Sequence, residues 1–237
     1  MPNTWFNFKQ FKVWQRDSAF KVGTDGVLLG AWCDVRDDNY ILDIGTGTGL
    51  MALMAAQRSE AEITAIEPDS LSAAEATLNT ARSPWRKRIT VISVSLQDFV
   101  LKGESKFDHI ITNPPFFRNS LSNPAERKSR ARHDLTLGSA ELLDISCRLL
   151  DQAGRLSLIL PYTEANLFIA EASGYGLYCT RMLNIKPLPS SPVKRILMEF
   201  SREKRMVSSG IMVIETGGRH QYSHEYRSLT RDFYLEF

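Results

Sequence analysis

A tetrapeptide in the middle of the chain, Asn113-Pro114-Pro115-Phe116, combines groups that can activate a poor nucleophile. It follows the apolar residues 107–112, which predict a buried strand. A planar exocyclic amine reacts poorly because its lone pair is delocalised, unless acceptors hold both of its hydrogens. The side-chain oxygen of Asn113 and the carbonyl of Pro114 can supply two acceptors, which the prolines hold in place. We interpret the tetrapeptide as the catalytic segment for methylation of such an amine, with Phe116 stacking on the flat group.

The same tetrapeptide also has a purely structural interpretation. Asn and Pro are the usual residues of turns, so Asn-Pro-Pro by itself is equally typical of a loop. The chemical interpretation therefore depends on the other elements of the chain and on where they place their polar residues.

A second candidate segment is the glycine turn at residues 45–49, which has the form G-x-G-x-G. It lies between residues 40–44, predicted as a strand, and an amphipathic segment predicted as a helix. Asp43 ends the strand, where its carboxylate would repel a pyrophosphate and attract an ammonium group. This favours S-adenosylmethionine over NAD, with Asp43, Gly45 and Gly47 as cofactor-binding candidates, although a plain strand-to-helix connection remains the alternative.

An acidic residue ends the next predicted strand, residues 62–67. Glu67 lies 20 residues after Gly47, which is the spacing at which an acid binds a ribose diol in doubly wound nucleotide sites. Glu67 is therefore a cofactor-binding candidate, and a solvated strand end is the alternative.

Two further segments supply weaker cofactor candidates. Thr24 or Asp25 is a suitable N-cap for a short helix, and the free N–H groups there can face an anion, so Lys21 and Thr24 are candidates. The loop after the third predicted strand, residues 89–93, contains Asp98 as its only acid. This loop is expected to flank an adenine ring, although an aspartate at a helix start is equally plausible.

The predicted elements alternate between strand and helix, which is typical of a doubly wound α/β fold with a mostly parallel sheet, here expected to have seven strands. The last two strands are expected to form a hairpin-like pair at one sheet edge. One domain over residues 1–237 is expected, with an N-terminal extension 1–20 and a tail 203–237 packed on it. Besides those already given, the predicted helices are 70–83, 139–150 and 163–173, and the predicted strands are 156–160, 177–185 and 193–200.

Composition sets limits on the function. The 237 residues are 43% hydrophobic and 24% charged, with a net charge of +2, so affinity for nucleic acid must come from local clusters. The aromatic and basic residues 5–14 suit a strand or hairpin with one apolar face, and aromatics beside lysines can also contact nucleic acid. The structural interpretation is favoured because an exposed aromatic row would be adhesive.

One long polar segment, residues 117–133, follows the tetrapeptide. Loops of this length are uncommon, and functional loops are the exception among them that we expect here. Its cations can contact phosphates near the predicted base pocket, and a solvated surface loop is the alternative. The substrate-binding candidates in it are Arg127, Lys128, Arg130 and Arg132.

Three cysteines, Cys33, Cys147 and Cys179, lie far apart in apolar surroundings and predict free thiols in a reducing compartment. The cysteines and histidines lack zinc-ligand spacing, so no metal is expected. Neither a signal peptide nor a membrane-spanning run is present, so the expected location is cytoplasmic. No obligate protein partner is inferred.

Taken together, these segments resemble class I S-adenosylmethionine-dependent methyltransferases with an Asn-Pro-Pro-aromatic motif, over about residues 20–200. Four stretches make the chain similar, nearly end to end, to the tRNA1(Val) adenosine N6-methyltransferase family. These stretches are Phe8-Lys9-Gln10-Phe11, residues 21–32, Ser83-Pro84-Trp85 and Phe233-Tyr234-Leu235.

The resemblance implies methyl transfer from S-adenosylmethionine to N6 of the adenosine 3′ of the valine anticodon. It places the cofactor on Asp43, Gly45, Gly47 and Glu67, and the target base on residues 113–116, with Asn113 beside both. The family often has an aspartate where this chain has Ser95, so Ser95 or Asp98 is expected to substitute at the adenine edge.

Other functions remain open from the residues alone. A protein glutamine presents a similar planar NH2 group for N5-methylation, and guanine N2 of ribosomal RNA is a third acceptor. A cofactor-binding module that acts only as a scaffold is the alternative outside enzymes.

Overall fold

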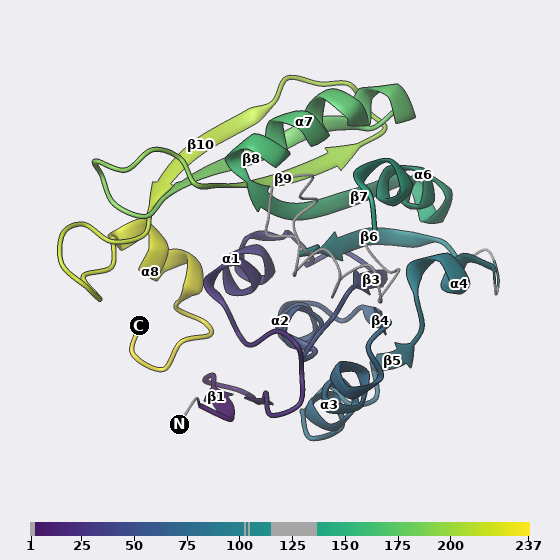
Figure 1. Ribbon diagram of the computed structural model, residues 1–237, viewed down its shortest axis with the longest axis horizontal. Coiled ribbons are helices and arrows are strands. Elements are labelled where there is room, and N and C mark those ends of the chain that lie inside the picture. Colours follow the sequence, from purple (N-terminus) through teal and green to yellow (C-terminus); the bar gives the residue numbers. More distant parts are fainter. Residues whose placement is uncertain (1–2, 102, 104, 115–136) are drawn as a thin grey trace, which may run out of the picture.

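The computed structural model of the protein describes residues 3–101, 103, 105–114 and 137–237. A central sheet runs through it, with helices on both faces (Figure 1). The sheet has eight strands in the order β10-β8-β9-β7-β6-β3-β4-β5. Strands β7, β6, β3, β4 and β5 are parallel to one another, β9 is antiparallel to both neighbours, and β10 is parallel to β8. The predicted fold class, a doubly wound and mostly parallel α/β sheet, is confirmed.

The strands that lead into the candidate site begin and end where the apolar runs predicted. They are β3 (Tyr40–Ile44), β4 (Glu62–Glu67), β5 (Ile89–Ser93) and β6 (Phe107–Thr112). The central residues of β3, β4 and β6 are mostly buried between helices on both sides, which is why these runs are largely apolar. The strand β5 lies at the sheet edge, and its Val91 and Ile92 are half-buried.

The remaining strands need one correction to the expected count of seven. Strands β7 (Leu150–Pro161), β8 (Tyr178–Lys186) and β9 (Arg195–Ser201) form as expected, with β8 and β9 antiparallel. An eighth strand, β10 (Ser208–Val213), comes from the predicted tail and pairs with β8, so the β8–β9 pair is not at the edge. Its exposed Ser208, Ser209 and Ile211 gave no alternating pattern that would have marked an edge strand.

Two sets of helices pack in two separate hydrophobic clusters of the core, and each set draws on both halves of the chain. The first hydrophobic cluster holds residues of α1 (Thr24–Trp32), α2 (Leu50–Arg58) and α8 (His224–Thr230). The second holds residues of α4 (Leu96–Leu101), α6 (Ser139–Leu149) and α7 (Tyr162–Ala172). A single 3-10 turn, η1 (Ser173–Tyr175), follows α7.

The order of the strands creates a switch point between β3 and β6. From β3 the chain adds β4 and β5 on one side, and then returns to add β6 and β7 on the other. Such a reversal leaves a crevice at the carboxyl ends of the two central strands, where ligands of doubly wound sheets bind. The segments after β3 and β6 are the glycine turn and Asn113-Pro114.

The helix α3 (Ser70–Ala81) exposes leucine side chains to solvent and buries polar ones. Leu71 and Leu78 are 61% and 54% exposed, whereas Glu75 and Asn79 are buried. The buried polar groups are satisfied by the N-terminal segment, since Glu75 accepts hydrogen bonds from the backbone N–H groups of residues 16–18. The seven-residue spacing of Leu71 and Leu78 puts both on one face of a helix, but that face points to solvent.

The N-terminal residues form a hairpin, β1 (Trp5–Asn7) with β2 (Lys12–Trp14), which confirms the predicted arm. It lies beside α3 in Figure 1. The C-terminal segment contacts the same region, because the N–H of Lys9 donates to the carbonyl of Phe233. These contacts support the single-domain organisation, which stays a prediction.

The three cysteines are free. Burial raises the pKa of the Cys33 thiol to about 12 and that of Cys179 to about 11, so neither is a ready nucleophile. None of the helices in the part of the chain that the structure describes has the length and apolar character needed to cross a bilayer.

Candidate active site

The predicted site residues meet at one edge of the sheet because of the strand register. Ile44 of β3 is paired with Ile66 of β4 and with Thr112 of β6. The next residue of each strand is therefore at the same level, which brings Gly45, Glu67 and Asn113 into one row. The hydroxyl of Thr112 donates to the carbonyl of Ile44 at 3.0 Å and fixes β6 against β3 just before this row.

The glycine turn adopts the left-handed backbone that glycine permits. Gly45, Gly47 and Gly49 have φ angles of +69°, +56° and +83°. A methyl group placed on Gly45 or Gly47 would meet no atom within 4 Å, whereas one on Gly49 would lie 3.5 Å from Ala76 of α3. The first two glycines thus border open space, and the third allows α2 to pack closely on α3.

Asp43 holds this turn together from inside the protein. Its side chain is 1% exposed, and Oδ2 accepts hydrogen bonds from the Thr46 hydroxyl at 2.6 Å and from the Ala52 N–H at 3.1 Å. The other oxygen, Oδ1, is buried with no hydrogen-bond partner among the described residues. Burial raises the pKa of Asp43 to about 7, and the charge of Glu67 acts in the same direction. A buried, unpaired carboxylate oxygen beside an open turn is suited to a cationic ligand.

Glu67 lies on the other side of the same turn. One carboxylate oxygen accepts the N–H of Gly47 at 2.9 Å, and the other accepts the N–H of Asp69 at 3.0 Å. Burial raises the pKa of Glu67, and these two hydrogen bonds oppose the shift. The carboxylate therefore joins the glycine turn to the start of α3, at the position predicted for a ribose contact.

The two candidates after β5 bond to each other. The hydroxyl of Ser95 donates to the Asp98 carboxylate at 2.8 Å and accepts the N–H of Asp98 at 3.1 Å. This is a helix cap at the start of α4. The S-x-x-D spacing in the sequence could have indicated it. A contact of either residue with an adenine edge stays a prediction.

The start of α1 borders the row from the other side. The N-cap is Gly23 rather than Thr24 or Asp25, because Asp25 instead forms an ion pair with Arg195 of β9 at 2.8 Å. A methyl group on Gly26 would lie 4.0 Å from the Asn113 amide nitrogen, so α1 passes close to that side chain.

The other predicted residues divide between exposed and undescribed positions. Lys21 and Thr24 are exposed, and Pro114 is buried directly after Asn113. Pro115, Phe116 and the substrate-binding candidates lie outside the described residues. Those candidates are Arg127, Lys128, Arg130 and Arg132.

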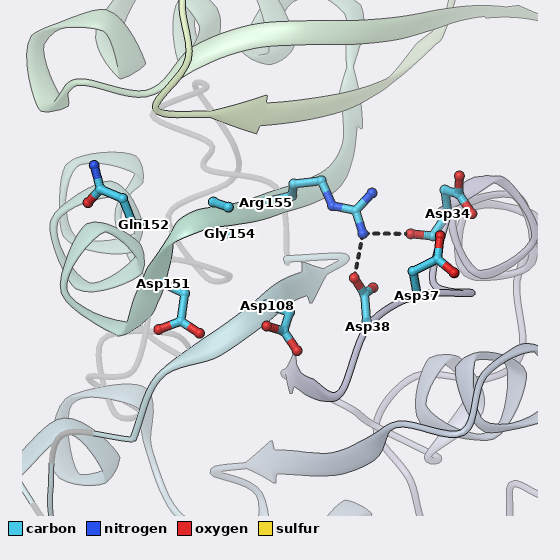
Figure 2. Close-up of a pocket in the computed structure, with 9 residues that line it drawn as sticks. Asp34, Asp37, Asp38, Asp108, Asp151, Gln152, Gly154 and Arg155 are labelled. Atoms are coloured by element: carbon cyan, nitrogen blue, oxygen red, sulfur yellow. Dashed lines mark hydrogen bonds and ion pairs between the residues drawn. The ribbon is translucent and has the colours of Figure 1, made fainter.

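The opposite edge of the sheet holds a different arrangement, which Figure 2 shows. A cavity of about 540 Å³ opens there, and most of its polar lining consists of aspartates around Arg155. The Arg155 guanidinium donates to Asp38 and to the carbonyl of Asp34. Among the described residues no group of three or more His, Cys, Asp or Glu is arranged to hold a metal ion. The acidic lining does not suit a nucleotide, so the site remains at the carboxyl edge.

Comparison with known proteins agrees with this geometry. The family described as "Methyltransferase small domain" matches residues 18–160. A tRNA1(Val) (adenine(37)-N6)-methyltransferase of Bacteroides thetaiotaomicron is 46% identical over 99% of both chains, and that of Trichodesmium erythraeum is 42% identical over all of both. The chain belongs to this family.

Solved structures support the fold alone. A predicted O-methyltransferase of Agrobacterium tumefaciens has a TM-score of 0.65 at 22% identity and covers 88% of this chain and 96% of its own. TYW2 of Pyrococcus horikoshii, solved in complex with MeSAdo, has a TM-score of 0.59 at 15% identity and covers 82% and 70%. The class I methyltransferase fold expected for the family is therefore confirmed.

Several residues around the candidate site were not predicted from the sequence. Asn79 donates from its side chain to the carbonyl of Thr48 in the glycine turn, and Thr46 bonds to Asp43. Arg195 reaches the site through its ion pair with Asp25, which lies 170 residues earlier in the chain. Long-range pairs of this kind cannot be found from spacing, whereas Thr46 is three residues from Asp43 and could have been.

Proposed function

We propose that the protein transfers a methyl group from S-adenosylmethionine to N6 of adenosine 37 in tRNA1(Val). The observation that carries the proposal is the register that brings the open glycine turn after β3 and Asn113-Pro114 after β6 to the two sides of the switch point. A donor site and an acceptor site then lie next to each other. Full-length relatives named for this reaction support the choice of substrate.

The turn and its two acids are suited to hold the cofactor. Gly45 and Gly47 leave room for a ligand against the backbone, and the unpaired Oδ1 of Asp43 suits its positive charge. Glu67 is placed to accept hydrogen bonds from a ribose. S-adenosylmethionine supplies a methyl group on a sulfonium, which makes that carbon electrophilic. Lys21, Thr24, Ser95 and Asp98 are proposed as outer contacts.

Asn113 and Pro114 prepare the acceptor. The Asn113 side-chain oxygen and the Pro114 carbonyl accept the two N6 hydrogens, which localises the lone pair toward the methyl donor. The acceptors are fixed before the base arrives, because Asn113 follows a strand bonded to β3 through Thr112. The target base must leave its stack to reach them, and anticodon loops present their bases partly unstacked.

The rest of the substrate is proposed to contact cations near the site. Arg127, Lys128, Arg130 and Arg132 follow Phe116 in the sequence and are proposed as phosphate contacts, while Phe116 stacks on the base. A tRNA substrate also implies a location in the cytoplasm. One domain, with both ends of the chain packed on it, is sufficient for this reaction.

An Asn113→Ala variant tests the proposal. Loss of one preorganised acceptor is expected to lower kcat by about 10²-fold or more, with cofactor affinity little changed. The measurement is nucleoside mass analysis of tRNA after incubation with enzyme and cofactor. Asn166→Ala is the matched control, because Asn166 is an exposed amide on α7 whose side chain donates to the Tyr162 carbonyl one turn away.

Different outcomes contradict different parts of the proposal. Equal N6-methyladenosine from Asn113→Ala and wild type would remove the role of Asn113. Methylation of guanine N2, or of a protein glutamine and not of tRNA, would show a different acceptor at the same site. Absence of methyl transfer to any of these acceptors would favour the scaffold interpretation.

A further inference from the structure

The outward face of the N-terminal hairpin combines tryptophans with cations. We call it the Trp–cation face and define it as Trp5, Lys12, Trp14, Arg16 and Arg82. Trp5 and Trp14 are opposite each other across the hairpin. The Lys12 ammonium lies 4.4 Å from the ring centroid of Trp5 and 5.0 Å from that of Trp14. The guanidinium carbons of Arg16 and Arg82 lie 4.7 and 5.8 Å from the Trp14 ring.

The inward face of the same hairpin region accounts for its structural role. Phe8 and Phe11 are 4% and 8% exposed and stack on each other at 4.6 Å. They also contact Tyr234 and Trp85. These aromatics hold the hairpin on the protein, so the tryptophans and cations of the outward face are not needed to bury apolar surface. Trp5 in particular remains 38% exposed.

The cations of the Trp–cation face lack acidic partners. Lys12, Arg16 and Arg82 are exposed and form no ion pair with any residue that the structure describes. Elsewhere, Arg155 and Arg181 each pair with a buried carboxylate. Positive charge is also concentrated here, since residues 3–20 and 70–90 contain seven Lys and Arg against two Asp and Glu, in a chain of net charge +2.

The face is physically connected to the cofactor turn. The Asn79 side chain accepts the N–H of Trp14 and donates both to the Trp14 carbonyl and to the Thr48 carbonyl, each at 2.8 Å. A single buried amide thus joins β2 to the glycine turn. After β2, the chain continues along α3 through bonds to Glu75 and Ser72, and then enters α1 beside Asn113.

We propose that the Trp–cation face binds the sugar-phosphate backbone of the substrate RNA outside the target nucleotide, with Trp5 stacking on an unpaired base. The inference rests on the proposed function for the identity of the RNA. Cations without a carboxylate partner among the described residues suit phosphates, and the exposed indole of Trp5 suits a base, whereas an acidic protein partner would use the cations alone. The face extends the RNA site along α3.

The charge test replaces three cations together, as Lys12→Gln, Arg16→Gln and Arg82→Gln in one variant. The KM for tRNA is expected to rise about tenfold at 150 mM salt with kcat little changed, and the slope of log affinity against log salt to fall by about 2 to 3. Lys204→Gln is the matched control, because Lys204 is also exposed, with its ammonium 5.8 Å from the Tyr178 ring. The control is expected to change neither quantity.

The stacking test is Trp5→Ala, with Trp5→Phe as the conservative variant. Loss of one stacked base is expected to weaken RNA affinity by about fivefold or more without changing the salt slope, and Phe is expected to restore most of it. Thermal unfolding of each variant shows whether a loss of RNA affinity comes from misfolding. If Trp5→Ala is misfolded, the RNA affinity of Trp5→Phe and the salt slope test the proposal instead.

The inference and the proposed function fail in different ways. If wild type methylates adenosine in tRNA but the triple variant keeps both KM and salt slope, the face does not bind RNA and the proposed function stands. If wild type binds tRNA through the face yet methylates no adenosine, the proposed function fails and the surface stands. A variant defective only toward an acidic peptide would make the partner a protein and overturn the inference.

Discussion

Each edge of the parallel sheet contains a buried aspartate, and the two are in opposite electrostatic states. At the amino edge, Asp38 is 8% exposed, with His109 Nδ1 2.8 Å from one oxygen and Arg155 on the other. Burial by itself would raise the pKa of Asp38, but His109 and Arg155 hold it below its ordinary value. At the carboxyl edge, Asp43 forms no ion pair with any residue that the structure describes, and burial raises its pKa to about 7.

The difference separates a structural edge from a functional one. The amino-edge network continues from His109 to Ser157, whose hydroxyl lies 2.8 Å from Nε2, and all three side chains are buried. Its charges are satisfied by the chain itself, so it has nothing left to offer a ligand. The carboxyl edge leaves one carboxylate oxygen and two open glycines unmatched, which is expected where a ligand completes the structure.

The largest effect is expected at the amino edge, from Asp38→Ala. Removing this carboxylate leaves Arg155 and His109 without their partner, and loss of one member of a buried charge pair is destabilising by about 3–5 kcal/mol. Urea unfolding measures it, and Asp34→Ala is the neighbouring control. Asp34 is an exposed partner of Arg36, and such surface pairs contribute about 0–1 kcal/mol. Equal losses of unfolding free energy in Asp38→Ala and Asp34→Ala would contradict the distinction between the two edges.

A smaller effect on stability, but a specific effect on binding, is expected from Gly47→Ala. At the Gly47 φ of +56°, adding a side chain lowers the free energy of unfolding by about 1–2 kcal/mol. The methyl group would project into the open space beside the turn. Gly176→Ala is matched, because Gly176 has a φ of +75° and an equally open surrounding far from the turn in sequence.

Both glycine variants are expected to lose similar stability, whereas only Gly47→Ala loses S-adenosylmethionine affinity, by about tenfold or more. Calorimetric titration with the cofactor measures this difference. Unchanged cofactor affinity in Gly47→Ala would mean that the open space beside the turn is not the binding site.

A change that is spread over several pH units, and is therefore small at any one pH step, is expected at Asp43. The pKa of its carboxyl is 3.8 in the unfolded chain and about 7 in the folded one. Between these two pH values the folded state therefore binds more protons than the unfolded state. Its contribution to stability therefore falls as pH rises from about 4 to 7, by up to roughly 1.4 kcal/mol per pH unit. Asp43→Asn removes this dependence while keeping an acceptor for Thr46 and Ala52.

The difference in unfolding free energy between wild type and Asp43→Asn, measured from pH 4 to pH 8, is expected to shift progressively in favour of the variant. Cofactor affinity at pH 8 is expected to fall in the same variant, since the charge is lost. A difference that stays constant over this range would show that Asp43 is paired in solution.

The sequence was informative where one element decides the outcome. The boundaries of β3, β4, β5 and β6 were predicted, because these parallel strands are short apolar runs that end in polar or turn residues. Glu67 and Asn113 were placed at one edge for the same reason, since the carboxyl ends of parallel strands share an edge.

The errors arose where distant segments compete for a residue. Asp25 was a plausible N-cap, but Arg195 binds its carboxylate instead. The face of α3 that looked apolar is exposed, because the N-terminal segment supplies hydrogen bonds to Glu75 and Asn79 on the other face. The residues of β10 were predicted as part of a tail, because their own sequence pattern does not indicate a strand. They form a strand because they pair with β8.

The inverted helix α3 has a consequence for protein engineering. Its solvent side carries the leucines, so Leu71 and Leu78 are suitable positions for charged substitutions that improve solubility. Its concealed side carries Ser72, Glu75 and Asn79, each serving as an anchor for main-chain groups elsewhere. A redesign that simply filled buried positions with larger apolar residues would detach the amino-terminal arm and loosen the loop behind the cofactor at the same time.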